Sequence, residues 1–380
     1  MNLEKIFIIL FTSSSLIISY YIKVDLVTSK YLKVIACPDC KGTLRDIRIN
    51  QRLLGCYCEK CKLIYPIKNG IFILLPKNAR NYDLEYNLVL NLKSKLESIN
   101  NYRLGQIIKN TLKLLHSMKD VKTWEWDDEE FWSKEYKKEK SSMVEKNWND
   151  RLWQREVLVN QLVDRSKLNK KTILDVGCGE GQNFRLLLSR FCDKNTLYIA
   201  TDISYNGLQL NRIRSKHKNS IYILCTADKL PFQNKAIDIL CYFGILHHTQ
   251  RKTATIPQDS RLVKPGGYIL IHEAMATPTL ATFLPGLYKS TFEESEHEER
   301  IDKYALLKEI NSNKNLRIIR VEEIYSLFLS IMLQVFSNVM INNKTFFQII
   351  SKFDNLFIKL FGKLTRLFAA REIMVLVHKS

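Results

Sequence analysis

The sequence predicts an α/β fold built on a mostly parallel sheet and preceded by a small cysteine-rich domain. Short apolar runs alternate with helical patterns from residue 172 onward, as parallel strands joined by helices require. The first of these runs leads into a glycine-rich turn, and two C-x2-C pairs lie near the N-terminus. The length of 380 residues is sufficient for two domains.

The composition is that of a globular protein. Hydrophobic residues make up 46% and charged residues 26%, which excludes a wholly disordered chain and a fibrous repeat. The formal net charge of +19 is compatible with nucleic acid, an anionic membrane or an acidic substrate. Because the lysines are spread along the chain, we interpret most of this charge as solvated surface. Nine cysteines, five of them within residues 37–61, favour a reducing, cytoplasmic compartment and one metal site.

The N-terminal segment, residues 1–27, contains an uncharged apolar stretch at 6–22. Its seventeen residues are at the lower limit for a helix that spans a bilayer. The lysines that follow would place its C-terminal side in the cytoplasm. Two interpretations stay open: attachment to the inner face of a membrane, and a helix buried against the rest of the chain.

Four cysteines have the spacing of a zinc site. Cys37 and Cys40 form one C-x2-C pair, Cys58 and Cys61 form another, and seventeen residues separate them. Two such pairs, brought together by a hairpin, surround Zn²⁺ with four thiolates and leave no open position, so the metal is expected to be structural. Cys56 is an alternative to Cys58, although its interval to Cys61 does not fit a C-x2-C pair.

The residues around these cysteines, CPDCKGTL and GCYCEKCKLIYPIKNGIFILLP, extend the pattern over residues 28–76. This stretch resembles the small zinc-ribbon protein that activates several tRNA and protein methyltransferases, and its bacterial relatives. The resemblance implies a short sheet beside the ribbon that contains Tyr65, Pro66, Ile67 and Gly70. It also implies a methyltransferase domain downstream, because members of this family are often fused to one.

Residues 77–150 are predicted to form a helical connector and a lid. Polar and apolar residues alternate at helical spacing over 77–123, and all five tryptophans follow within 124–153. Aromatic residues at this spacing most often pack into a groove. The alternative is a cap folded over a bound cofactor, in which Tyr136 contacts the substrate.

The run TILDVGCGEG begins the parallel sheet. Gly177, Gly179 and Gly181 allow a tight turn and the close approach of a ligand to the backbone. The next strand ends in Asp202, which lies 21 residues after Gly181. An acid at this point can accept from both hydroxyls of a ribose. The alternative for Asp202 is the N-cap of the following helix.

The motifs ILDVGCGEG, ADKLPF, AIDILCYFGILHHT and LVKPGGYILIHE follow one another around this acid. The set resembles class I S-adenosylmethionine-dependent methyltransferases, in particular the type 11 domain. The resemblance implies a Rossmann-like, seven-stranded sheet over residues 151–380. In that family the methionine amine, the ribose and the adenine amino group would be held at Asp175, Asp202 and Asp228, respectively. The full implied set for S-adenosylmethionine is Asp175, Gly177, Gly179, Gly181, Asp202, Ile203, Ala227, Asp228 and Phe232.

The loop after the fourth strand carries His247 and His248. In the family this loop meets the transferable methyl group, which makes both histidines candidates for a general base. The alternative is a structural pair that caps the next helix. Relatives that methylate an exocyclic or amide nitrogen commonly carry an Asn-Pro-Pro-aromatic run at this position, and relatives that methylate C5 of cytosine use a Pro-Cys pair. This chain has neither motif. Oxygen, carbon or amine acceptors on a small molecule are therefore favoured.

Residues 325–370 are expected to form an insertion between the last two strands. Its second half is amphipathic, which fits a packed helix or a helix lying on a membrane surface. We therefore expect a methyltransferase for a small and lipophilic metabolite. An RNA methyltransferase and a cofactor-binding scaffold without catalysis are the alternatives, with nucleic acid the less favoured partner; the oligomeric state is left without a prediction.

Overall fold

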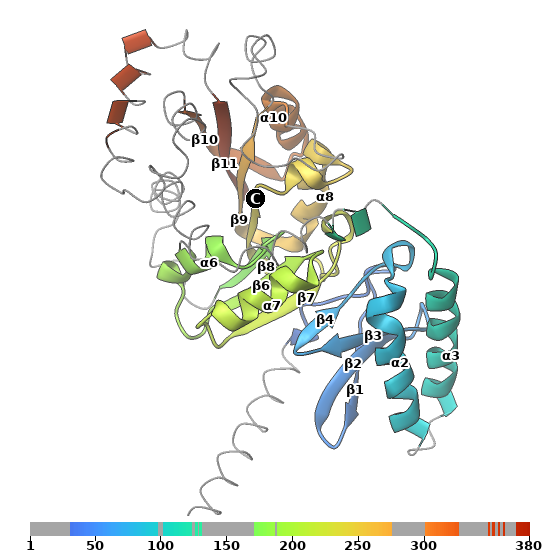
Figure 1. Ribbon diagram of the computed structural model, residues 1–380. Helices are drawn as coiled ribbons and strands as arrows, with labels where there is room; N and C mark the ends of the chain where they lie inside the picture. Colours follow the sequence, from blue (N-terminus) through green and yellow to red (C-terminus); the bar gives the residue numbers. More distant parts are fainter. Residues whose placement is uncertain are drawn as a thin grey trace, which may run out of the picture. The chain divides into compact units, whose positions relative to one another are not determined.

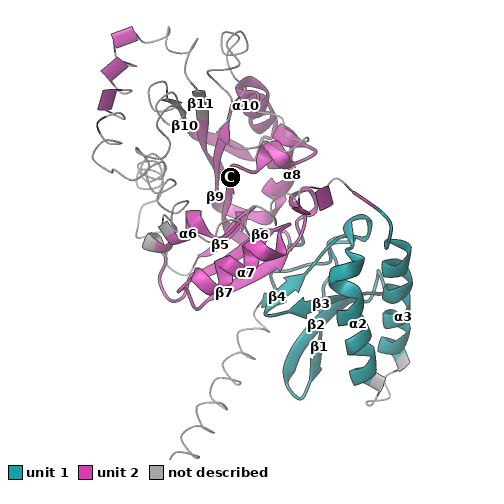
Figure 2. Ribbon diagram, viewed as in Figure 1, with its two compact units in different colours: residues 1–121, 231–233 teal, residues 122–230, 234–380 magenta. Residues whose placement is uncertain are grey.

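The computed structural model describes residues 31–97, 102–123, 171–275, 301–326 and 370–380, except Leu187, together with isolated positions within 126–130 and 349–361. Two compact units make up the chain (Figures 1 and 2). The first comprises residues 1–121 together with Pro231–Gln233, and the second comprises residues 122–230 and 234–380.

The first unit contains an antiparallel meander of four strands in sequential order. Two tight turns fix its register. Asn50 and Gln51 both have positive φ angles (48° and 66°), and so do Asn69 and Gly70 (50° and 76°). Two consecutive left-handed residues form the turn whose twist matches that of a hairpin, and Asn-Gly is its preferred sequence. The strands are β1 (Arg45–Ile49), β2 (Arg52–Cys58), β3 (Leu63–Lys68) and β4 (Ile71–Ile73).

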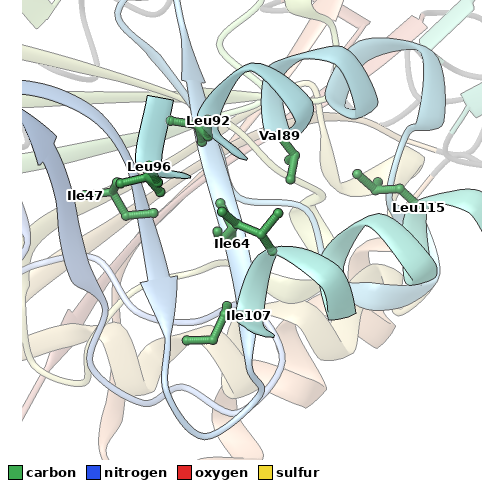
Figure 3. Close-up of a cluster of buried hydrophobic side chains, with 8 residues drawn as sticks. Ile47, Ile64, Val89, Leu92, Leu96, Ile107 and Leu115 are labelled. Atoms are coloured by element: carbon green, nitrogen blue, oxygen red, sulfur yellow. The ribbon is translucent and has the colours of Figure 1, made fainter. Parts of the chain in front are cut away.

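A helical hairpin, α2 (Tyr82–Glu97) and α3 (Tyr102–Ser117), packs on this meander. Asn81 starts α2, because its side chain accepts from the backbone N–H of Leu84 at 2.9 Å. The hairpin and the sheet share one apolar core (Figure 3), in which aliphatic side chains of both helices meet side chains of β1 and β3. The core consists of Ile47, Ile64, Val89, Leu92, Leu96, Ile107, Ile108 and Leu115.

One segment of the first unit comes from far along the sequence. Pro231–Gln233 pairs with residues 34–36: the N–H of Ala36 donates to Pro231 O at 2.7 Å, and the N–H of Gln233 donates to Val34 O at 2.8 Å. Ile35 and Phe232 lie opposite each other in this bridge, and both are fully buried. Phe232 therefore contributes to the core of the first unit.

The second unit is built on a sheet of seven described strands in the order β7-β6-β5-β8-β9-β11-β10. The five strands from β7 to β9 are parallel, and β11 is antiparallel to both of its neighbours. The predicted Rossmann-like fold is confirmed. The strands are β5 (Thr172–Val176), β6 (Leu197–Asp202), β7 (Ser220–Leu224), β8 (Ile237–Phe243), β9 (Val263–Ala274), β10 (Leu316–Ser326) and β11 (Ala370–Lys379).

Apolar side chains dominate the central strands. In a parallel sheet the connecting helices cover both faces, so side chains on either face are buried. In β5, Ile173, Leu174 and Val176 are buried, as is every residue of β6 from Leu197 to Thr201. The described helices of this unit are α6 (Gln182–Leu186), α7 (Tyr205–Arg214), α8 (Thr255–Asp259) and α10 (Lys303–Ser312).

Several predictions from the sequence fall on residues outside the described ranges. These are the apolar stretch 6–22, the candidate lid residue Tyr136 and most of the 325–370 insertion. Within the described residues, no helix is both long and apolar enough to cross a bilayer.

Two leucines of α2 test the shared core of the first unit. Leu92 is 5% exposed in this core, whereas Leu90 is 37% exposed. We expect Leu92→Ala to lower the free energy of unfolding of this unit by about 2–5 kcal/mol, because it leaves a cavity. The same change at Leu90 should cost less than about 1 kcal/mol. Urea titration of the full chain, with hydrogen exchange of the α2 and α3 amides, measures both; equal losses would contradict the packing described here.

Candidate active site and metal centre

The candidate active site lies at the carboxyl edge of the parallel sheet, where the strand order reverses. The chain runs from β5 outward through β6 to β7, and then returns to place β8 on the other side of β5. Loops that follow strands on the two sides of such a point diverge, and ligands of doubly wound sheets bind there. The turn after β5 and the loop after β8 therefore form the two sides of the candidate site.

Gly177, Gly179 and Gly181 all have left-handed backbone conformations, with φ angles of 64°, 51° and 79°. Two of them are also closely packed. A Cβ at Gly177 would lie 2.5 Å from Cγ1 of Ile245, and one at Gly181 would lie 2.1 Å from Oδ1 of Asn211. These glycines are thus required by the fold itself, because the loop after β8 and helix α7 pack directly against the turn.

Asp202, the last residue of β6, holds the same turn. Its two carboxylate oxygens accept from the N–H of Gly179 and from the N–H of Ser204, each at 2.7 Å. Burial raises the pKa of the Asp202 carboxyl, while these hydrogen bonds and the nearby charge of His248 oppose the shift. The N-cap of α7 is Ser204, whose hydroxyl accepts from Gly207 N at 3.2 Å. The helix-cap alternative for Asp202 is therefore wrong.

Asp175 lies in β5, below the turn, and is fully buried. Its Oδ2 accepts from the hydroxyl of Tyr198 at 3.0 Å, and Tyr198 also contacts the amide of Asn211 at 3.4 Å. Asn211 reaches the Cys178 sulfur at 3.3 Å. Asp175 is thus part of a buried polar network that supports the glycine turn from underneath.

The predicted adenine residues fall into two groups. Ala227 and Asp228 lie in the 3₁₀ turn Ala227–Lys229, and Ile203 directly follows Asp202; all three are half-buried. Both carboxylate oxygens of Asp228 accept from the N–H of Gln250, at 3.1 and 3.2 Å. Burial raises the pKa of the Asp228 carboxyl. Phe232 lies in the first unit, as described above.

His247 and His248 lie side by side in the 3₁₀ turn Leu246–His248, with ring centroids 4.2 Å apart. Glu273, near the end of β9, accepts from the loop at three points. Its Oε1 accepts from the N–H of Ile245 and of Leu246, each at 2.7 Å, and its Oε2 lies 2.8 Å from Nδ1 of His247. Glu273 was not predicted, although a buried acid after the apolar run YILIH is an available signal.

The first unit brings the four predicted cysteines together. The sulfur atoms of Cys37, Cys40, Cys58 and Cys61 all lie within 4.8 Å of one another, and Cys56 is not among them. The Cys37–Cys61 and Cys40–Cys58 distances are 3.7 and 3.5 Å. Four thiolates in a tetrahedron around Zn²⁺ are about 3.8 Å apart, given Zn–S bonds of about 2.3 Å. The cluster thus fits a tetrahedral metal ion.

Backbone and side-chain contacts support this cluster. Lys41 and Lys62, which directly follow the second cysteine of each pair, have φ angles of 57° and 54° and turn the chain back. The hydroxyl of Tyr65 lies 3.3 Å from the Cys37 sulfur. Burial raises the pKa of the Tyr65 hydroxyl, so it stays protonated and can donate to a thiolate. The resemblance placed Tyr65 in the sheet beside the ribbon, and the structure adds its contact with the Cys37 sulfur.

Known proteins resemble this chain in two parts. Residues 174–271 match a family described as methyltransferase domain, and residues 29–70 match one described as Trm112p-like protein. A UPF0434 protein from Nitrosococcus oceani is 39% identical over 56 residues, which are 15% of this chain and 90% of that protein. These matches confirm the class I methyltransferase domain and the zinc-ribbon resemblance.

Matches in the second part are more distant. A fatty-acid O-methyltransferase from Mycolicibacterium smegmatis is 26% identical over 117 residues, which are 31% of this chain and 42% of that enzyme. The structure of geranyl diphosphate C-methyltransferase from Streptomyces coelicolor A3(2) matches with a TM-score of 0.43 and 12% identity, over 60% of this chain and 81% of that chain. The chain spans only 6%, 61% and 3% of three further relatives.

Gly177 and Gly266 together test whether the turn depends on close packing. Both have positive φ angles, but a Cβ at Gly266 has no atom within 4 Å. We expect Gly266→Ala to cost about 1–2 kcal/mol of strain only. Gly177→Ala should cost more and weaken binding of S-adenosylhomocysteine by at least about tenfold, because Ile245 must move. Thermal denaturation and calorimetric titration measure both effects; equal behaviour of the two variants would contradict the assignment.

Proposed function

We propose that this chain, which belongs to the UPF0434 family through its N-terminal residues and carries a methyltransferase domain after them, is an S-adenosylmethionine-dependent methyltransferase acting on a small lipophilic acceptor. The observation that carries the proposal is the packing of three segments at the strand-order reversal. The glycine turn, Asp202 and the His247–His248 loop contact one another there through backbone hydrogen bonds and side-chain packing.

The donor side of the site fits S-adenosylmethionine, which supplies a methyl group bound to a positively charged sulfur. The Asp202 carboxylate accepts from the backbone N–H groups of Gly179 and Ser204, and a carboxylate has about four acceptor sites, so it can also accept from a ribose hydroxyl. Gly177, Gly179 and Gly181 would pass beneath the methionine moiety. Asp175 is proposed to help hold the methionine amine.

The adenine would lie beside Ile203, Ala227 and Asp228. The 3₁₀ turn Ala227–Lys229 supports this for Ala227 and Asp228. Phe232 belongs to the first unit, where its bridge to Ile35 accounts for its burial, and it is not part of the proposed site.

On the acceptor side, His247 and His248 are proposed to act as general bases that remove a proton from the acceptor. Tyr136 is proposed to contact the substrate. Methyl transfer needs the nucleophile, the methyl carbon and the sulfur held in line, so positioning supplies much of the rate. Two observations support a lipophilic acceptor. A relative acts as a fatty-acid O-methyltransferase, and large apolar side chains of this chain are exposed within 349–361. They are Ile349, Phe353, Leu356, Leu360 and Phe361.

The ion in the first unit is proposed to be structural Zn²⁺. Four sulfur ligands complete its coordination and leave no position for substrate. Burial raises the pKa of the Cys58 thiol to about 11. A bound cation would lower this pKa again, because it favours the thiolate form of the ligand.

A labelled-methyl assay tests the proposed reaction. The purified full-length chain is incubated with S-adenosylmethionine carrying a labelled methyl group and with fractionated cell extract. We expect label in the lipid or small-molecule fraction. Label confined to RNA would contradict the proposed acceptor, and the absence of label from every fraction would favour a cofactor-binding scaffold.

Two aspartates, one at the carboxyl end of a parallel strand and one at the amino end of another, test the ribose assignment. Asp202 ends β6, whereas Asp238 lies at the start of β8 and accepts from Thr172 N and Lys264 Nζ. We expect Asp202→Asn to weaken binding of S-adenosylmethionine roughly 10- to 100-fold, as for lost hydrogen bonds to a charged group of about 1.5–3 kcal/mol. Asp238→Asn should leave the affinity unchanged. Calorimetric titration decides; unchanged affinity of the Asp202 variant would refute its role.

Two cysteines of β2 test the metal centre. Cys58 belongs to the sulfur cluster, and Cys56, two residues earlier, does not. We expect the purified full-length protein to contain one zinc ion per chain, Cys58→Ser to lower this content, and Cys56→Ser to retain it. Elemental analysis by mass spectrometry measures the content. Zinc lost from the Cys56 variant but kept by the Cys58 variant would show that the ligand set is wrong.

A further inference from the structure

Glu273 is an acid that the assignments above leave without a role in the reaction. Its side chain is fully buried near the end of β9, yet it meets the loop that carries both candidate bases. Three nitrogens of that loop surround the carboxylate: Ile245 N and Leu246 N at 2.7 Å, and His247 Nδ1 at 2.8 Å. A buried carboxylate is stable only when hydrogen-bond donors or charges compensate it.

The chemistry of this contact determines which nitrogen of His247 carries the proton. An ionised carboxylate can only accept, so the hydrogen between Oε2 and the ring must reside on Nδ1. In the neutral ring the other nitrogen, Nε2, is then the one without a proton and the one able to take up a proton. Carboxylates that orient a histidine in this way fix both its tautomer and the angle of its ring.

We propose that Glu273 is a positioning residue that holds His247 as the Nδ1-protonated tautomer and so makes Nε2 the general base; this rests on the proposed function. An acceptor O–H gives its proton to Nε2 while the oxygen forms a bond to the methyl carbon. The electron pair of the carbon–sulfur bond goes to sulfur, which leaves a neutral thioether. The proton on Nε2 then passes to solvent.

The surroundings of His247 support this assignment. Glu273 Oε1 fixes the backbone of the two residues before His247, while Oε2 of the same carboxylate contacts the ring itself. The Nζ of Lys252 donates to the carbonyl oxygen of His247 at 3.2 Å and holds the loop from its other side. The side chain of His247 is 17% exposed, whereas that of Glu273 is not exposed, so the ring is reachable while its partner is not.

Glu273→Gln separates this role from a purely structural one. The amide oxygen can replace Oε1 and still accept from Ile245 and Leu246. The amide nitrogen then lies opposite Nδ1 of His247 and can only donate. The variant therefore keeps the loop anchored but forces the proton to Nε2. Glu309→Gln, on α10, is the matched control.

The readout is the nitrogen-15 NMR spectrum of histidine-labelled full-length protein at pH 8, where a free imidazole is neutral. His247→Gln assigns the resonances of that ring. We expect wild-type and Glu309→Gln proteins to show a proton on Nδ1 of His247, and Glu273→Gln to show it on Nε2. A wild-type ring protonated on Nε2, or an unchanged tautomer in a folded Glu273→Gln variant, would overturn the proposal. The wild-type spectrum alone tests it if the variant does not fold.

Transfer of labelled methyl to a lipid extract is measured in parallel. Glu273→Gln should lower kcat roughly 10²- to 10⁴-fold, the usual contribution of a general base, with KM little changed. Full activity with the reversed tautomer would overturn the positioning role and leave the methyltransferase intact. A correct tautomer without transfer in any protein would count against the proposed function, since the NMR result does not depend on turnover.

Discussion

The close approach of two loops at Gly177 is the constraint on which the candidate active site depends. The side chain of Ile245 occupies the space that a Cβ at Gly177 would need, with a separation of 2.5 Å. The turn after β5 and the loop after β8 can therefore meet only if this residue has no side chain. Asp202 adds a hydrogen bond from the third strand end, at 2.7 Å from Gly179 N. Three parallel strands are thus joined at their carboxyl ends by close packing and a backbone hydrogen bond.

A second interaction joins the cysteine-rich ribbon to the helical hairpin. Arg80 and Glu85 form a fully buried ion pair at 2.6 Å, and the guanidinium also donates to Ile64 O at 2.9 Å and lies over the ring of Tyr65 at 5.1 Å. Tyr65 in turn contacts the sulfur of Cys37. Removing one partner of such a pair costs about 3–5 kcal/mol, because a charge is left buried. The start of α2 is therefore linked to the cysteine cluster through Tyr65, although the sequence presents the helices as a connector.

Local requirements could be predicted from the sequence, and long-range pairings could not. The C-x2-C spacing and the glycines of the turn reflect the geometry of a few neighbouring residues. The structure brings the four cysteines together and gives these glycines positive φ angles, as expected. Glu273 is 26 residues from His247, so its contact depends on how β9 lies beside β8. Phe232 was assigned to adenine because its neighbours match a motif, whereas its bridge to Ile35 arises from pairing across almost 200 residues. The alternative of a helix cap at Asp202 failed because α7 begins two residues later, with Ser204 as its N-cap.

The pairing of Pro231–Gln233 with residues 34–36 brings a segment from far along the sequence into the first unit. These three residues belong to the first unit and follow Ala227 and Asp228 within a few positions along the chain. Their two backbone hydrogen bonds, at 2.7 and 2.8 Å, together contribute only about 2 kcal/mol. Residues 34–36 directly precede Cys37, which belongs to the cluster of thiols. A metal ion bound by these thiols would therefore stabilise the unit in which Pro231–Gln233 is paired.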